Sequence, residues 1–304
     1  MHDIVGHDNI LSFFDNVIQN GNLGHAYCFC GPGRVGKFTV AQELAARLLK
    51  TTRDKIQMHP DYIVVERIVD EKTEKLKKDI SIEQVRSAIS QLSQTSFLPG
   101  GYRVAIVDHA EFLSTAASNA LLKTLEEPRG KTVIFLITQN EKELLGTIRS
   151  RCQLFYFSLV NQRKIASWLE KNVIEPDRAQ ELTEYCQGIP GKAWEWANDA
   201  ESFEIYKQEI NRFKGLLRKP FYEKLSIVEK LFGDKEDHIK ARERLQDVLS
   251  IWQIELNQMA REGNSNLSDK TIISVSDDIS KARKYLEENI HPRLLTEHIL
   301  LQLP

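Results

Sequence analysis

One short stretch of the chain, GPGRVGK over residues 31–37, has the composition and spacing of a phosphate-binding loop. Its glycines let the backbone curl so that successive N–H groups face an anion, and a helix that begins after the loop adds positive potential. The apolar run Ala26–Cys30 precedes the loop and a helical pattern begins at Phe38, which is the context that the GxxxxGK spacing requires. The residues expected to hold the phosphates of ATP or ADP are Gly31, Gly33, Gly36 and Lys37.

The position after Lys37 departs from the usual pattern. A Ser or Thr there normally supplies the hydroxyl that holds Mg²⁺, whereas this chain has Phe38. Thr39 cannot replace that hydroxyl, because one residue along a helix turns the side chain by about 100°. The sequence therefore predicts a phosphate cradle that lacks one of its metal ligands.

Asp108 ends the apolar run over 103–108, at the place where P-loop NTPases carry a carboxylate that binds Mg²⁺. In hydrolysing enzymes of the AAA+ class a Glu follows this Asp and polarises the attacking water, but here the next residue is His109. Glu111 lies two residues further on, past the expected strand end, and is poorly placed to replace that Glu. An alternative is that Asp108 and Glu111 only cap the helix that follows.

Phe38 and His109 are two independent departures that affect the same reaction. Metal positioning and water activation both act on the transition state, so hydrolysis by this chain is expected to be slow or absent. Nucleotide binding can survive, because the backbone amides of the loop and Lys37 remain. A vestigial loop that binds nothing is the alternative.

The composition sets limits on the class of protein. The chain has 304 residues, enough for two or three domains, and its 41% hydrophobic and 28% charged residues are typical of a folded globular protein. Its formal net charge is −2, so any contact with nucleic acid has to be local or shared with partners. No apolar run is long enough to cross a membrane and no signal-peptide pattern begins the chain, which predicts a cytoplasmic protein without membrane contact.

The cysteines do not form a metal-binding pattern. They are Cys28, Cys30, Cys152 and Cys186, with no CxxC pair among them. We therefore expect reduced and mostly buried thiols, and no structural zinc site.

Apolar runs alternate with helical patterns in the first half of the chain, which predicts a parallel α/β sheet of five strands. The expected strands are 26–30, 62–65, 103–108, 133–138 and 153–157. Ser81 and Ser114 have the positions of helix N-caps, and Ser81 belongs to a capping box. After Phe157 only helical patterns follow, so the fold class is α/β plus all-α.

Four motifs together resemble the delta-prime family of clamp-loader subunits of bacterial DNA polymerase III, which are AAA+ proteins. They are His25-Ala26-Tyr27, GPGRVGK, VDHAEFLSTAASNALLKTLEEP over 107–128, and TIRSRCQ over 147–153. The resemblance implies an AAA+ P-loop α/β domain over 1–160 and a small helical lid domain over 161–200. It also implies a helical domain over 201–304 that joins the collar of a heteropentamer.

The resemblance also implies roles for single residues. Ser150-Arg151-Cys152 matches the SRC motif, whose arginine inserts as a finger into the ATP site of the neighbouring subunit. Thr138 matches the sensor-1 position, and Lys192 matches a sensor-2 position that usually carries Arg, so the bidentate fork is lost. The structural alternatives are an Arg151 that is paired within its own domain and a Thr138 hydroxyl that is satisfied at the strand end.

The implied partners are the gamma/tau and delta subunits, the sliding clamp and primer-template DNA. Many clamp-loader subunits carry a four-cysteine zinc module after the first helix, but residues 50–61 contain no cysteine. The favoured interpretation is a non-motor subunit, without intrinsic ATPase activity, that lends Arg151 to a neighbour while the clamp is loaded during DNA replication. The alternatives are an active gamma/tau-type ATPase and a stand-alone small-molecule kinase, against which the long helical tail argues.

Overall fold

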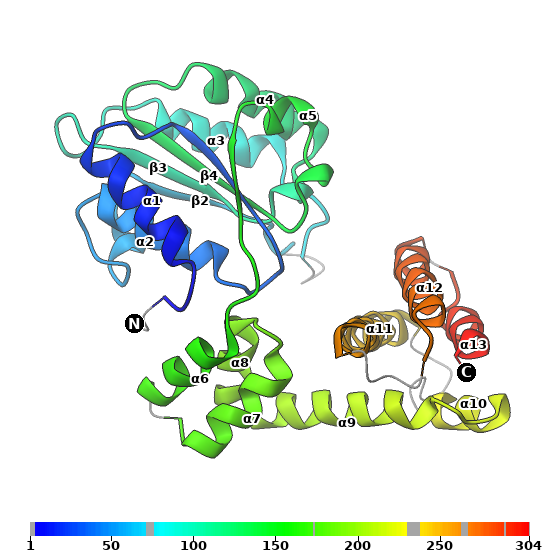
Figure 1. The fold of residues 1–304 in the computed structure, drawn as a ribbon. Helices are drawn as coiled ribbons and strands as arrows, with labels where there is room; N and C mark the ends of the chain where they lie inside the picture. The colour runs from blue at the N-terminus through cyan, green and yellow to red at the C-terminus, as the bar shows by residue number, and fades with distance from the viewer. Residues whose placement is uncertain are drawn as a thin grey trace. The chain divides into compact units, whose positions relative to one another are not determined.

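The structure is a computed structural model that describes residues 4–70, 76–172, 174–229, 238–262, 267–288 and 290–303. The chain forms two compact units, Met1–Asn198 and Asp199–Pro304 (Figure 1). Each unit has an apolar core of its own.

The first unit is built on a five-stranded sheet in which all neighbouring strands are parallel. In order across the sheet the strands are β2 (Tyr62–Val65), β3 (Arg103–Val107), β4 (Thr132–Thr138), β1 (Ala26–Cys30) and β5 (Gln153–Tyr156). The predicted five-stranded parallel sheet is confirmed, and every strand end lies within one residue of its expected bound. The three inner strands are buried along their whole length, as expected for a parallel sheet that is covered on both faces.

Helices cover the two faces of this sheet (Figure 1). One face carries α1 (Asp8–Gln19) and α2 (Lys37–Leu48), and the other carries α3 (Ile82–Leu92), α4 (Thr115–Glu126) and the short α5 (Gly146–Arg149). Both expected caps are confirmed. Ser81 and Gln84 form a reciprocal capping box on α3, and the Ser114 hydroxyl accepts a hydrogen bond from the Ala117 N–H at the start of α4.

Three more helices complete the first unit: α6 (Gln162–Lys171), α7 (Pro176–Cys186) and α8 (Pro190–Asn198). They pack on one another, with Ile165, Leu169 and Leu182 fully buried. They belong to the same compact unit as the sheet up to Asn198. A separate lid domain over 161–200 therefore stays a prediction.

The regular secondary structure among the described residues of the second unit is all helical, as the sequence predicted. Its helices are α9 (Ala200–Leu216), α10 (Phe221–Glu229), α11 (His238–Glu262), α12 (Asp269–Glu287) and α13 (Pro292–Gln302). Trp252 is fully buried in its core, and the indole N–H donates a hydrogen bond of 2.9 Å to the buried Glu209 carboxylate. The role of this unit as a collar domain stays a prediction. Among the described residues, no helix is both long and apolar enough to span a bilayer.

An aromatic cluster joins α1 to the sheet. The Phe14 ring is fully buried, and its centroid lies 4.8 Å from that of Tyr27 and 5.2 Å from that of Phe155. These three rings belong to α1, β1 and β5. Phe14 therefore fixes the segment that precedes the sheet to two of its strands.

We expect Phe14→Ala to lower the free energy of unfolding by about 3–5 kcal/mol, because it removes a buried ring and leaves a cavity. Phe97→Ala is the matched control, since the Phe97 side chain is 70% exposed, and it should change stability by no more than about 0.5 kcal/mol. Chemical denaturation of the two variants measures the difference. Equal losses of stability would show that the cluster does not hold α1 in place.

Candidate nucleotide-binding site

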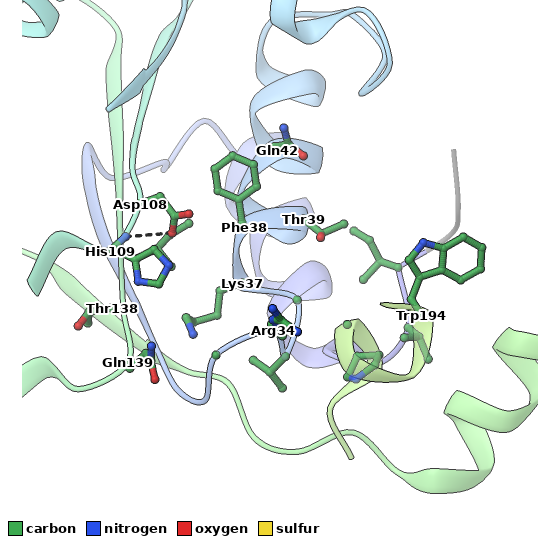
Figure 2. A pocket seen from close by; sticks show the side chains of 18 of the residues that line it. Arg34, Lys37, Phe38, Thr39, Gln42, Asp108, His109, Thr138, Gln139 and Trp194 are labelled. Carbon is green, nitrogen blue, oxygen red and sulfur yellow. Dashed lines mark hydrogen bonds between the residues drawn. The ribbon is translucent and has the colours of Figure 1, made fainter. Parts of the chain in front are cut away.

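A cavity of about 540 Å³ opens at the edge of the sheet where β1, β3 and β4 end (Figure 2). The P-loop leaves β1, Asp108 follows β3, and Thr138 ends β4, so parallel strands bring all three to one edge. Of the residues that the sequence predicted for the site, five line this cavity: Gly33, Gly36, Lys37, Asp108 and Thr138. Gly31, the first residue after β1, is not among the residues that line the cavity.

The P-loop requires glycine at two of its positions. Gly31 has φ 146°, and a Cβ there would lie 2.3 Å from the Phe157 carbonyl oxygen, a contact that no side chain tolerates. Gly36 has φ 113° and directly precedes α2. These two residues therefore let the backbone turn sharply between β1 and the N-terminus of the helix.

Lys37 is folded over its own loop. Its Nζ donates hydrogen bonds of 2.6 Å to the carbonyl oxygens of Gly31 and Pro32. Burial lowers the pKa of the Lys37 ammonium below its usual value, although the carboxylates of Glu111 and Asp108 act in the opposite direction. The ammonium thus lies beside the cradle, where it can pair with a phosphate.

Asp108 and His109 follow β3 as a tight turn. The His109 N–H donates a hydrogen bond of 3.0 Å to Asp108 Oδ1, drawn as a dashed line in Figure 2, and His109 has φ 52°. Burial raises the pKa of the Asp108 carboxyl above its usual value. Asp108 therefore faces the cavity as a partly desolvated carboxylate.

Glu111 does not line the cavity. One oxygen of its buried carboxylate lies 3.4 Å from His109 Nδ1, and this hydrogen bond is the main cause of the raised pKa of His109. Ser114 caps α4, so the alternative in which Asp108 and Glu111 cap that helix has no support.

The residues around the cradle do not fit Mg²⁺. Phe38 and Thr39 both line the cavity but leave α2 in different directions, and the position next to Lys37 presents a phenyl ring (Figure 2). Asp108 then stands as a single carboxylate, and the described parts of the chain hold no group of three or more acidic, His or Cys side chains arranged for a metal ion. Mg²⁺ at a nucleotide site is held by one or two protein oxygens together with phosphate oxygens and waters, and here the phenyl ring of Phe38 takes the place of the hydroxyl next to Lys37.

The two expected sensor residues are placed differently. Thr138 lines the cavity, and its hydroxyl makes hydrogen bonds of 3.2 Å with both the N–H and the carbonyl oxygen of Asn140. Lys192 is not part of the cavity wall. Its ammonium lies 5.8 Å from the Trp196 ring centroid, and burial lowers its pKa. Pro190, Gly191 and Trp194 of α8 face the cavity instead.

Several contacts of the loop were not predicted from the sequence. His7 Nε2 lies 2.9 Å from the Val35 carbonyl oxygen, and the Gly191 N–H donates a hydrogen bond of 3.0 Å to the Arg34 carbonyl oxygen. Arg34 also forms an ion pair with Glu195 of α8. The loop is therefore held by the segment before α1 and by α8.

Arg151 lies outside this cavity, in the turn between α5 and β5. Its Nε donates a hydrogen bond of 2.7 Å to Glu126 Oε1, and its Nη1 donates one of 2.8 Å to the Thr147 carbonyl oxygen. The side chain is 32% exposed. Arg151 is thus paired within its own unit but is not enclosed by it.

We expect Gly31→Ala to lower the free energy of unfolding by at least about 1–3 kcal/mol, because the new methyl group clashes with the Phe157 backbone and φ is unfavourable. Gly146→Ala is the control, since a Cβ there meets no atom within 4 Å and no positive φ is needed. That variant should change stability by less than about 1 kcal/mol. Thermal or chemical unfolding tests both. A stable Gly31→Ala protein would show that the loop is not held against Phe157.

Comparison with known proteins places this geometry in a family. A sequence profile described as "DNA polymerase III, delta subunit" matches residues 6–161. DNA polymerase III subunit delta' of Pseudomonas aeruginosa is 35% identical over 55% of this chain and 52% of its own length, so the match spans about half of that relative. The subunit delta' of Bacillus subtilis is 25% identical over 97% of this chain and 95% of that protein.

Among solved structures, a DNA polymerase III gamma subunit-related protein from Thermotoga maritima aligns with a TM-score of 0.54 and 16% identity. The alignment covers 95% of this chain and 97% of that one, and at this identity it shows the fold alone, which agrees with the expected α/β plus all-α fold class. The profile covers just over half of the chain and the relatives named above are delta-prime subunits, which confirms the resemblance inferred from the motifs. The chain therefore belongs to the DNA polymerase III delta subunit family.

Proposed function

We propose that this chain is a non-motor, delta-prime-like subunit of the replicative clamp loader. It assembles with gamma/tau and delta subunits into a heteropentamer, to which its helical second unit contributes the collar domain. Arg151 acts as an arginine finger in the ATP site of the neighbouring subunit. Hydrolysis there drives loading of the sliding clamp onto primer-template DNA during replication in the cytoplasm.

The position of Arg151 relative to the cavity of its own unit carries this proposal. Arg151 comes two residues before β5 and so lies at the amino-terminal edge of the parallel sheet, whereas the cavity lies at the carboxyl-terminal edge. β5 has four residues, which is roughly 13 Å at about 3.3 Å per residue. The guanidinium is therefore out of reach of its own cradle, and its partial exposure leaves it accessible to another chain.

The chemistry of the cavity supports a non-motor role. Phe38 removes the hydroxyl that would hold Mg²⁺, and His109 occupies the position of the water-activating carboxylate. The backbone cradle and the Lys37 ammonium are both in place. The cavity is therefore proposed to bind ATP or ADP without hydrolysing it.

Reconstitution of the clamp loader with Arg151→Ala tests the finger. Loss of a finger typically costs about 10³–10⁵ in rate, so DNA-stimulated ATP hydrolysis at the site next to this subunit should fall by a factor of that order. Arg149→Ala is the matched control, because Arg149 is an exposed arginine at the end of α5, two residues before Arg151. It should leave turnover unchanged.

Two results would contradict the proposal. Unchanged hydrolysis by an assembled Arg151→Ala complex would show that Arg151 is not an arginine finger. Robust ATP turnover by the isolated chain with Mg²⁺ would favour a gamma/tau-type motor. Assembly of the variant has to be checked by size-exclusion chromatography. Otherwise a failure to enter the ring would be mistaken for a loss of catalysis.

Nucleotide binding is tested separately with Lys37→Met in the isolated chain. We expect the affinity for ADP to fall by at least about tenfold, or 1.4 kcal/mol, because the cationic partner of the phosphates is lost. Lys142→Met, at an exposed position of the same unit, is the control and should bind as the natural chain does. Isothermal titration calorimetry measures both, and equal affinities would show a vestigial loop.

A further inference from the structure

The part of the cavity that normally holds a metal ion is apolar in this chain. The Phe38 ring follows directly on Lys37 at the start of α2 and lines the cavity. A Mg²⁺ ion keeps most of its bound waters and demands oxygen ligands. Burying such a hydrated ion against a phenyl ring leaves polar groups without partners, which costs free energy.

The chain itself brings positive charge to the same cavity. Arg34, Lys37 and Arg53 line it, and Asp108 is the single carboxylate in the described part of its wall. These three basic residues are the cations of the wall that a bound phosphate group would meet, and Arg34 also forms an ion pair with Glu195. Loop N–H groups and the N-terminus of α2 add to this positive potential. These basic side chains and N–H groups can therefore supply the positive charge that Mg²⁺ supplies in other P-loop proteins.

We infer that the cavity binds a nucleoside polyphosphate as the metal-free anion and disfavours its Mg²⁺ complex. This inference rests on the proposed binding of ATP or ADP at the same site. A free polyphosphate carries more negative charge than its Mg²⁺ complex and is therefore drawn more strongly to Lys37 and Arg53. It also requires no hydrated ion beside Phe38. Such a site holds nucleotide but cannot assemble the metal-dependent transition state of hydrolysis.

The volume and walls of the cavity agree with this ligand class. About 540 Å³ lies within the usual range for small-molecule sites. Away from the cradle the wall is apolar and aromatic, with Ile4, Val5, Trp168 and Trp194, and the two indole rings lie 5.5 Å apart. A flat base fits against such a wall, while the phosphates reach the loop.

The inference is tested by titrating the full chain with ADP in EDTA and in excess Mg²⁺, at one ionic strength because salt screens the attraction to the cations. We expect binding in EDTA to be at least as tight as in Mg²⁺. Phe38→Thr restores a hydroxyl next to Lys37, and its affinity for ADP should rise by at least about tenfold when Mg²⁺ is added. Phe38→Leu, apolar and without a hydroxyl, should behave as the natural chain does, with binding in EDTA at least as tight as in Mg²⁺.

The outcomes separate this inference from the function on which it rests. If the natural chain binds ADP at least about tenfold more tightly in Mg²⁺ than in EDTA, nucleotide binding stands and the metal-free inference is wrong. If ADP binds in neither condition, both the proposed nucleotide site and this inference are wrong. The role of Arg151 is tested by a separate assay and does not depend on that result. Thermal unfolding of the Phe38 variants establishes that each is folded.

Discussion

The parallel alignment of β3, β4 and β1 is the constraint on which the candidate site depends. Cys30 lies beside Thr138 and Val107 beside Leu136, so the three strands end within two residues of one another and place the P-loop, Asp108 and Thr138 at one edge. A slip of one residue would turn every side chain to the opposite face of the sheet. The burial of Tyr27 and Phe29 on one face therefore also fixes the geometry of the cavity.

The loop itself is held in place before any ligand arrives. Its backbone carbonyls contact His7 on one side and Gly191 on the other, and Gly31 packs against the Phe157 carbonyl. A Cβ on Gly191 would lie 2.6 Å from the Arg34 carbonyl oxygen, so α8 can approach this closely only with glycine at that position. A ligand that binds to such a preorganised cradle loses little affinity to ordering of the protein.

The sheet, the helix caps and the cradle could be predicted from the sequence because their signals are local. Apolar runs that alternate with helical patterns predict the strands, and Ser81 with Gln84 predicts a helix cap. The glycines of GPGRVGK predict the turn between β1 and α2. The contacts that hold the loop could not be predicted, since Gly191 meets Arg34 across more than 150 residues. Lys192 was expected near the phosphates, but one residue along a helix turns a side chain by about 100°, and Gly191 faces the cavity instead.

The pairing of Arg151 with Glu126 suits a residue that has to change partners. Both side chains are partly exposed, at 32% and 48%, and ion pairs of this kind contribute only about 0–1 kcal/mol. A charge-assisted contact between a guanidinium and a phosphate in a dry site is worth considerably more. In the proposed complex, Glu126 would therefore keep the guanidinium oriented in the free subunit without preventing its transfer. β5 lies between Arg151 and the cavity, so in the proposed complex one rigid sheet would hold both the arginine and the cradle.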